Sequence, residues 1–220
     1  MTKYIVLAFT ILFPYLLGSM NSAIVVCKTL QGKDIREYGS NNAGLTNVLR
    51  VFGKPTAIVT LIVDLIKGVA AVLICKYVAI GFDVEFFGNP LFISYLAGIF
   101  VIIGHVFPLY YGFRGGKGVL LTATTLLAID PLTWFFAMLV FFAIVALSRY
   151  VSLASMLAAI SYPIITGITQ TMRDYDHVLM NVLCTSFIAL LIVVKHHANI
   201  SRLIHGTENR LGSKPKDKEK

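Results

Sequence analysis

Seven apolar runs divide this chain, and they constrain its fold more than any other feature. They cover residues 4–26, 56–77, 91–107, 119–128, 132–147, 153–168 and 178–194. A helix needs about 20 residues to cross the hydrocarbon core of a bilayer, and in lipid a helix satisfies its own backbone polar groups. We therefore predict an all-α, polytopic membrane protein with seven transmembrane helices. With 57% hydrophobic and only 14% charged residues, the chain is not a water-soluble domain.

The fourth run is too short to span a bilayer unaided, which leaves two interpretations. Residues 119–147 form either two helices or one long helix kinked at Asp130-Pro131. With seven spans and the N-terminus outside, fifteen Lys and Arg residues fall on one side and three on the other, with Lys67 inside a span. Fusing the two runs changes the count to eight against ten. Because basic residues concentrate in the cytoplasm, we predict seven spans, an outside N-terminus and a cytoplasmic C-terminus.

This orientation also accounts for the formal net charge of +8, which we do not interpret as a sign of nucleic-acid binding. We predict a single integral membrane domain at residues 1–211 and a Lys-rich cytoplasmic tail at residues 212–220. The three cysteines are far apart in apolar runs. They predict neither a disulfide framework nor a metal site.

Three polar segments lie at the ends of these runs, all on the predicted cytoplasmic side. The first, at residues 39–50, reads Gly-Ser-Asn-Asn-Ala-Gly-Leu-Thr-Asn-Val-Leu-Arg. Its neutral hydrogen-bonding side chains are Ser40, Asn42, Thr46 and Asn47. Glycines let backbone N–H groups turn toward an anion, and Arg50 adds a two-pronged charge. The composition suits a phosphate cradle; the alternative is a polar turn that caps the next helix, with Ser40 or Asn42 as N-cap.

The second segment joins Gly-His-Val-Phe-Pro at residues 104–108 to Phe-Arg-Gly-Gly-Lys-Gly at residues 113–118. Its three closing glycines are Gly115, Gly116 and Gly118. With Lys117 they place N–H groups, a helix N-terminus and an ammonium group together, which favours anion binding. The alternative is a flexible turn with cations at the membrane surface. The Gly-Lys-Ser/Thr ending of a nucleotide P-loop is absent, so we do not infer ATP binding. We expect His105 to be a helix–helix hydrogen-bond partner.

The third segment covers residues 196–208. If it is helical, His196, Asn199 and Arg202 share one face, and apolar residues between 200 and 204 form another. An amphipathic helix lying in the membrane interface would look the same. Such an anchor does not require Asn199 or the Gly-Thr-Glu ending that contains Glu208.

Together these segments predict a basic pocket on one membrane face for molecules that carry phosphate groups. Inside the second run, Asp64 and Lys67 stand at i and i+3, where we expect a structural ion pair. The sequence has no Gly-x-Ser-x-Gly elbow, no His-Glu-x-x-His motif, no His followed five residues later by Asp, and no acidic cluster for magnesium. An enzyme built on these residues would work with cations, amides, a hydroxyl and histidine, without a metal or cofactor.

The three segments, in this order, resemble the motifs of the membrane-integral acyl-phosphate:glycerol-3-phosphate acyltransferases of bacteria, and the match covers nearly the whole chain. The resemblance implies acyl transfer from a fatty acyl phosphate to the 1-hydroxyl of glycerol 3-phosphate, which gives lysophosphatidic acid in the first step of phospholipid synthesis. It also implies a bacterial cell-membrane protein with a cytoplasmic active site. Because an acyl phosphate is already activated, such a site can rely on positioning and charge stabilisation.

On this basis we assign roles to the candidate residues. The expected catalytic residues are Ser40, Arg50, Lys117, His196 and Asn199. The expected substrate-binding residues are Asn42, Thr46, Asn47, Gly115, Gly116, Gly118, Arg202 and Glu208. Lys117 and the amides of 115–118 would hold the acyl phosphate, and Arg50 and Arg202 would bind glycerol 3-phosphate. The proton acceptor is either His196 or a substrate phosphate oxygen, and a covalent acyl-enzyme on Ser40 is the less favoured route.

The rival interpretation is a small transporter of phosphate esters. Transporters bind near the bilayer midplane between repeated halves. Here the polar segments gather at one face, and the sequence shows no inverted repeat. An enzyme would form product in detergent, whereas a carrier needs a sealed compartment.

Overall fold

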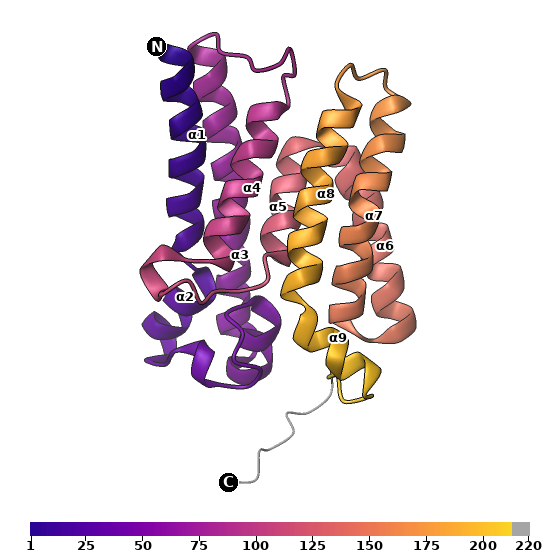
Figure 1. The fold of residues 1–220 in the computed structure, drawn as a ribbon. Helices are drawn as coiled ribbons and strands as arrows, with labels where there is room; N and C mark the ends of the chain where they lie inside the picture. The colour runs from indigo at the N-terminus through magenta and orange to yellow at the C-terminus, as the bar shows by residue number, and fades with distance from the viewer. Residues whose placement is uncertain (213–220) are drawn as a thin grey trace.

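The computed structural model describes residues 1–212 and is all-helical, with no named strand in that range. The helices, labelled in Figure 1, are α1 (Thr2–Ser19), α2 (Ser22–Gln31), α3 (Leu45–Gly81), α4 (Phe92–Val106), α5 (Val119–Ile129), α6 (Pro131–Ser148), α7 (Val151–Thr171), α8 (Val178–Lys195) and α9 (His197–Ile204). Two 3-10 turns, Ile35–Glu37 and Leu109–Tyr111, lie in the connections. Apart from Gly212, the Lys-rich tail predicted from the sequence lies outside the described residues.

Within residues 1–212, six stretches are long and apolar enough to cross a membrane. They are α1 with α2, α3, α4 with the turn that follows it, α6, α7 and α8. The expected seventh span, α5, is a separate helix of only 11 residues, about 16 Å long. The prediction of an all-α membrane protein therefore holds, and seven full-length spans are not found.

The first apolar run is broken, where the sequence predicted one helix over residues 4–26. Helix α1 ends at Ser19, and the Asn21 side chain accepts a hydrogen bond from the Ile24 N–H and caps α2. An asparagine favours an N-cap because its side chain replaces a missing helix partner. The break turns the polar Asn21-Ser22 pair into the protein interior, where both residues are buried.

Helices α5 and α6 form two separate arms, so the single kinked helix considered from the sequence is not found. Asp130 adopts an extended conformation between them and accepts a hydrogen bond from the Thr133 N–H at the start of α6. Gly118, at the start of α5, and Leu211 line one pocket, and the Leu211 N–H donates to Arg149 at the end of α6. The start of α5 and the end of α6 therefore lie at the same end of the molecule.

The short α5 makes this end concave. Both arms meet at Asp130, but α6 has 18 residues and α5 has 11, so α5 begins about 10 Å deeper. Figure 1 shows the start of α5 set back from the lower end of α6. The loop that carries Lys117 is thereby drawn into the body of the molecule.

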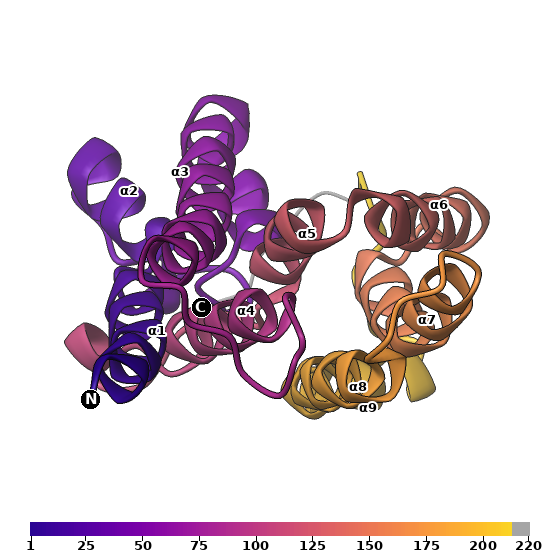
Figure 2. The same cartoon turned by 90° about the horizontal axis from the view of Figure 1, so that it is seen from above.

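Viewed from above, the helices form two groups (Figure 2). In one, α1 packs on α4 and α3 packs on α4 and α5; in the other, α7 packs on α6 and α8. The groups are joined where α5 meets α6 and where α4 contacts α8. These are the most extensive direct contacts between the groups, and a cavity lies between the groups beside them.

At the end of α7 and α8 away from α9, a buried polar cluster closes the space between the groups. Asp130 accepts hydrogen bonds from Thr133, from Gln170 at 3.2 Å and from Arg173 at 2.5 Å. Gln170 also donates to the Tyr95 hydroxyl and accepts from Asn181. We call Asp130, Thr133, Gln170, Arg173, Tyr95 and Asn181 the distal cluster. Its members come from α4, α6, α7 and α8 and from the connections beside them, so it ties the two groups together.

Candidate functional site

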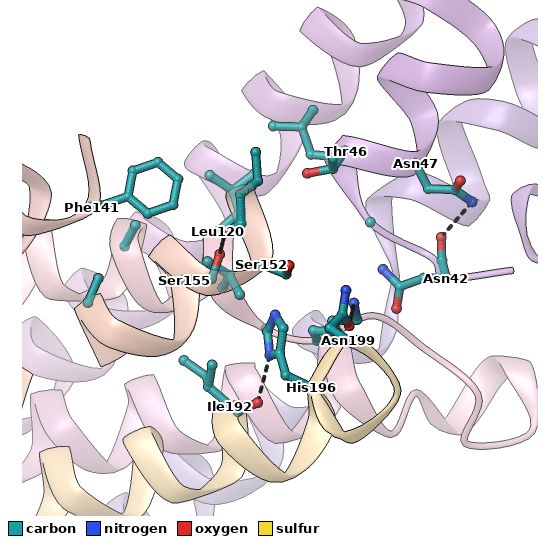
Figure 3. A pocket seen from close by; sticks show the side chains of 18 of the residues that line it. Asn42, Thr46, Asn47, Leu120, Phe141, Ser152, Ser155, Ile192, His196 and Asn199 are labelled. Carbon is teal, nitrogen blue, oxygen red and sulfur yellow. Dashed lines mark hydrogen bonds between the residues drawn. The ribbon is translucent and has the colours of Figure 1, made fainter. Parts of the chain in front are cut away.

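The main pocket lies between the two groups of helices, at the end where α9 packs, and has a volume of about 830 Å³. Its opening is polar, with lining side chains from the three sequence segments: Ser40, Asn42, Thr46, Asn47, Arg50, Lys117, His196, Asn199, Arg202 and Glu208. Its interior is apolar and is lined by α5, α6, α7 and α8. Figure 3 shows Asn42, Thr46 and Asn47 facing His196 and Asn199 across this opening, with Phe141 and Leu120 to one side.

The conformation of the first segment depends on Asn47, whose side chain is buried and forms hydrogen bonds with the backbone of its own loop. Its side-chain amide donates to the carbonyls of Tyr38 and Asn42, and its oxygen accepts from the Ser40 N–H at 3.0 Å. Asn47 thus holds the loop over the start of α3. Although Asn47 lines the pocket, its bonds are internal and leave Ser40 and Thr46 exposed beside it.

Two of the predicted substrate-binding glycines do not reach the pocket wall. The Gly116 N–H donates to the carbonyl of His105 at 3.2 Å. A side chain on Gly116 would collide with the His105 ring and the Ala43 carbonyl, and one on Gly115 with the His105 carbonyl and Pro108. These glycines permit close packing of the second segment against the first. Only Lys117 and Gly118 of this turn line the pocket.

Gly118 begins α5 with φ of 81°, a left-handed conformation that favours glycine. The first N–H groups of a helix have no partner within it. Gly118, Val119 and Leu120 all line the pocket, so the positive end of the α5 dipole meets the cavity next to Lys117. Of the amides expected to bind an anion, those at the start of α5 are the ones that border the pocket.

Beneath both loops lies a buried ionic group. Asp64 accepts a hydrogen bond from Ser22 at 2.6 Å and pairs with Lys67 at 3.0 Å, as the i, i+3 spacing predicted. Asn21 donates to the carbonyls of Ala43 and His105, one from each of the first two segments. His105 is buried here with its Nδ1 3.5 Å from the Asn21 side-chain nitrogen, which fits the hydrogen-bonding role expected from the sequence. This group fixes the two loops relative to each other.

In the third segment Glu208 is the central residue. It accepts hydrogen bonds from Asn199 at 2.7 Å, Arg202 at 2.6 Å and Ser152 at 2.9 Å. Asn199 turns its other side-chain atom, the carbonyl oxygen, to the ammonium group of Lys117. The pKa of Glu208 is lowered, because these hydrogen bonds together outweigh the opposing effect of burial, so it is an anion that orients its neighbours.

His196 presents a neutral ring to the pocket. Its Nδ1 lies 2.8 Å from the Ile192 carbonyl, which can only accept a hydrogen bond, so Nδ1 carries the proton and Nε2 is an acceptor without a hydrogen-bond partner among residues 1–212 (Figure 3). Burial lowers the pKa of His196 to about 4, and the nearby Lys117 charge acts in the same direction. The ring therefore stays uncharged at neutral pH.

The pocket has an excess of positive charge. Five Lys or Arg and two Asp or Glu side chains line it, and both acids already pair with a basic residue. Within residues 1–212, Arg50 has no ion-pair partner. Burial lowers the pKa of Lys117 to about 8, and Arg202 and Arg50 repel its charge further. An anionic ligand would relieve this repulsion.

Sequence reasoning did not single out every residue of this site. Ser152 ends a Ser-Arg-Tyr-Val-Ser stretch that also resembles the acyltransferase family, but the sequence assigned it no role; its hydroxyl donates a hydrogen bond to Glu208. Lys54 and Arg210 also line the pocket. In the part of the chain that is described, no three His, Cys, Asp or Glu residues cluster as metal ligands would.

Comparisons with known proteins agree on one family. Residues 8–206 match the family profile described as glycerol-3-phosphate acyltransferase. A glycerol-3-phosphate acyltransferase of Chlorobaculum tepidum is 38% identical, covering 91% of this chain and 94% of the relative; one of Clostridioides difficile is also 38% identical, covering 96% and 97%.

Solved structures give the same answer. The fold is similar to the crystal structure of PlsY (YgiH), described as an integral membrane glycerol 3-phosphate acyltransferase, in its glycerol 3-phosphate form. The TM-score is 0.77 at 34% identity, over 93% of this chain and 95% of the other. The lysophosphatidic acid form of that protein gives a TM-score of 0.73 at 32% identity, with the same coverage.

Proposed function

Because the chain belongs to the glycerol-3-phosphate acyltransferase family, we propose that its pocket transfers a fatty acyl group from an acyl phosphate to the 1-hydroxyl of glycerol 3-phosphate. Acylation of glycerol 3-phosphate to lysophosphatidic acid is the activity of the family; acyl phosphate as the donor is our proposal. The carrying observation is that one cavity joins a cationic opening to an apolar interior. Two phosphorylated substrates and one acyl chain need this combination.

The cations divide between the two phosphate groups. Lys117 and the first amides of α5 hold the phosphate of the donor and stabilise the oxyanion that develops at the acyl carbon. Arg50, Arg202 and the hydroxyls of Ser40 and Thr46 bind the phosphate of glycerol 3-phosphate. Glu208 acts through Arg202 and Asn199, which it orients, and Asn47 acts through the loop that it holds.

The reaction is a direct substitution. The 1-hydroxyl oxygen attacks the acyl carbon, the bond from that carbon to the phosphate oxygen breaks, and inorganic phosphate leaves with the bonding electrons. The hydroxyl proton goes to the departing phosphate, which leaves with the bonding electrons and is a stronger base than an imidazole with a pKa of about 4. His196 Nε2 accepts the hydrogen bond of the hydroxyl and aims its oxygen.

This role for His196 has a direct test. A His196→Gln side chain can still accept a hydrogen bond, whereas His196→Ala cannot, so we expect Gln to retain at least about tenfold more kcat than Ala. Equal and complete losses in both folded variants would make His196 the proton acceptor instead.

The direct substitution also excludes a covalent acyl-enzyme on Ser40. Mass spectrometry of the enzyme incubated with the donor alone should therefore detect no acyl adduct on Ser40.

The function itself is tested with detergent-purified protein and labelled glycerol 3-phosphate. Acyl phosphate, acyl-CoA and acyl carrier protein are offered as separate donors. We expect lysophosphatidic acid from acyl phosphate without any sealed compartment. Product from acyl-CoA alone would overturn the proposed donor, and transport into liposomes without product would support the rival interpretation.

We also propose that the pocket opens to the cytoplasm of a bacterial cell and that the N-terminus lies outside. Support comes from the basic loops, which gather at the pocket end, as the positive-inside rule requires. Single cysteines at Lys33 and Asp83, both exposed and at opposite ends, test this in a variant without the three native cysteines. In intact spheroplasts an impermeant thiol reagent should label Asp83→Cys and spare Lys33→Cys; the reverse pattern would overturn the orientation.

A further inference from the structure

The apolar interior of the pocket is an arm with a closed end. Along α7 it is lined by Ser152, Ser155, Ala158, Ala159 and Tyr162, a series with helical spacing. The first four side chains are small, and the fifth is a large aromatic residue that is only 2% exposed. Figure 3 shows Ser155 and Leu120 close to Ser152, with Phe141 to one side of them. The small side chains leave space for a ligand, and the Tyr162 ring blocks that space at its deep end.

The other helices close the arm at the same depth. Leu126 of α5 and Ala137 of α6 line it there, and both are buried. Together with Tyr162 they belong to the main hydrophobic core. Nearer the opening, by contrast, the lining residue Phe142 is largely exposed. The deep end of the arm is therefore enclosed by buried residues, whereas its outer part reaches the exposed surface of the protein.

Behind Tyr162 the same face of α7 continues into the distal cluster. Thr166 and Gln170 follow at positions i+4 and i+8 and are fully buried. Gln170 bonds Tyr95 of α4, Asp130 and Asn181 of α8. A chain of methylene groups cannot pass through this bonded cluster without leaving polar groups unsatisfied. The arm is blind because a polar barrier lies beyond its floor.

From these observations we infer that Tyr162 is the floor of the acyl-binding arm and sets the length of acyl chain that the enzyme prefers. The inference rests on the proposed function. Ten residues separate Ser152 from Tyr162, a rise of about 15 Å. An extended chain advances about 1.2 Å per bond, so about 12 carbons fit between the level of Ser152 and the ring. Longer chains must bend or leave their ends outside the arm.

The test is a chain-length profile. The ratio kcat/KM is measured with acyl phosphates of 10 to 18 carbons for wild type, Tyr162→Ala, which deepens the arm, and Ala158→Leu, which shortens it. We expect Tyr162→Ala to raise the ratio of 18-carbon to 12-carbon activity about tenfold or more, and Ala158→Leu to lower it by a similar factor. Tyr162→Phe keeps the ring and should keep the wild-type cutoff.

The matched control is Ile164→Ala on the same helix, whose side chain is exposed on the outer surface of α7 and should leave the profile unchanged. Folding is checked by thermal unfolding in detergent. If Tyr162→Ala does not fold, Ala158→Leu carries the test alone. Active variants with the wild-type profile would overturn the inference while leaving the proposed function intact, whereas no transfer from any acyl phosphate by wild type would overturn the proposed function first.

Discussion

Two polar clusters lie at opposite ends of α7 and α8 and use similar residues in different ways. The distal cluster pairs Asp130 with Arg173 and satisfies Gln170, Tyr95 and Asn181 with one another. The cluster at the pocket also has an acid, Glu208, bonded to an arginine and an amide. There, however, Lys117 and Arg50 add positive charge, neither forms an ion pair with an acid of residues 1–212, and an open cavity adjoins them.

The difference separates a structural cluster from a functional one. In the distal cluster each charge and amide is used by a neighbour, so it contributes to holding the helices together. At the pocket Glu208, Asn47 and Asp64 form hydrogen bonds and ion pairs with some of the neighbouring polar groups. These bonds hold the surrounding loops in place. What remains free is cationic and faces an apolar arm, and this surplus gives the pocket its affinity for anionic substrates.

Removing the surplus charge should have the largest effect on activity. We expect Lys117→Ala to lower kcat/KM about 10³-fold, because it removes the cation closest to the developing negative charge. The thermal unfolding midpoint should hardly fall, since the substitution relieves repulsion with Arg202. The matched variant is Arg173→Ala, which removes a cation from the distal cluster and should leave turnover within about twofold of wild type. Comparable activity losses in both would erase the distinction between the clusters.

Glu208→Gln should lower kcat/KM for glycerol 3-phosphate by about 10- to 100-fold. The amide can still accept from Ser152, but it no longer holds the charge of Arg202. We expect the loss mainly in KM, because Arg202 is proposed to bind the phosphate group. A change confined to kcat, with KM unaltered, would argue against that assignment.

The lowered pKa of Lys117 predicts a pH dependence. Lys117 is charged below its pKa of about 8 and neutral above it, so kcat/KM should fall as pH rises beyond 8, approaching about tenfold per unit. Bound phosphate raises the pKa of Lys117, and kcat should therefore decline at a higher pH. Lys117→Arg keeps its charge and should lack this alkaline limb; an unchanged limb would assign it to another group.

Asp130→Ala tests the distal cluster from its centre. It leaves Arg173, Thr133 and Gln170 without a shared acceptor, and we expect a loss of about 2 kcal/mol of stability, or about 5 °C in unfolding midpoint. Folded protein below the transition should turn over within about threefold of wild type. A large loss of activity at unchanged stability would show that this cluster belongs to the catalytic machinery.

The smallest expected effect is that of a chelator. The proposed chemistry uses cations and amides and no metal, so EDTA should leave initial rates within experimental error. Readdition of Mg²⁺ serves as the control. Loss of activity in EDTA that Mg²⁺ restores would require a metal in the mechanism.

Much of the architecture could be predicted from the sequence because hydropathy and charge act locally. The apolar runs predicted the places of α3, α4, α6, α7 and α8, and the basic residues favoured separate α5 and α6. The break at Asn21 was missed, since α1 and α2 are both apolar enough to read as one helix. An asparagine that caps a helix inside the protein gives no hydropathy signal.

The sequence alone determined that the chain folds as apolar helices and that three polar segments fall at one end, because run length and charge are properties of neighbouring residues. Only the tertiary structure decided which of those polar groups remain free. The Gly116 N–H donates to His105, and Asn47 accepts from Ser40 within its own loop, so neither group is free for a ligand. Glu208 likewise accepts from Ser152, which is distant in the chain. The depth of the arm at Tyr162 also depends on four helices meeting, which a single run of residues cannot specify.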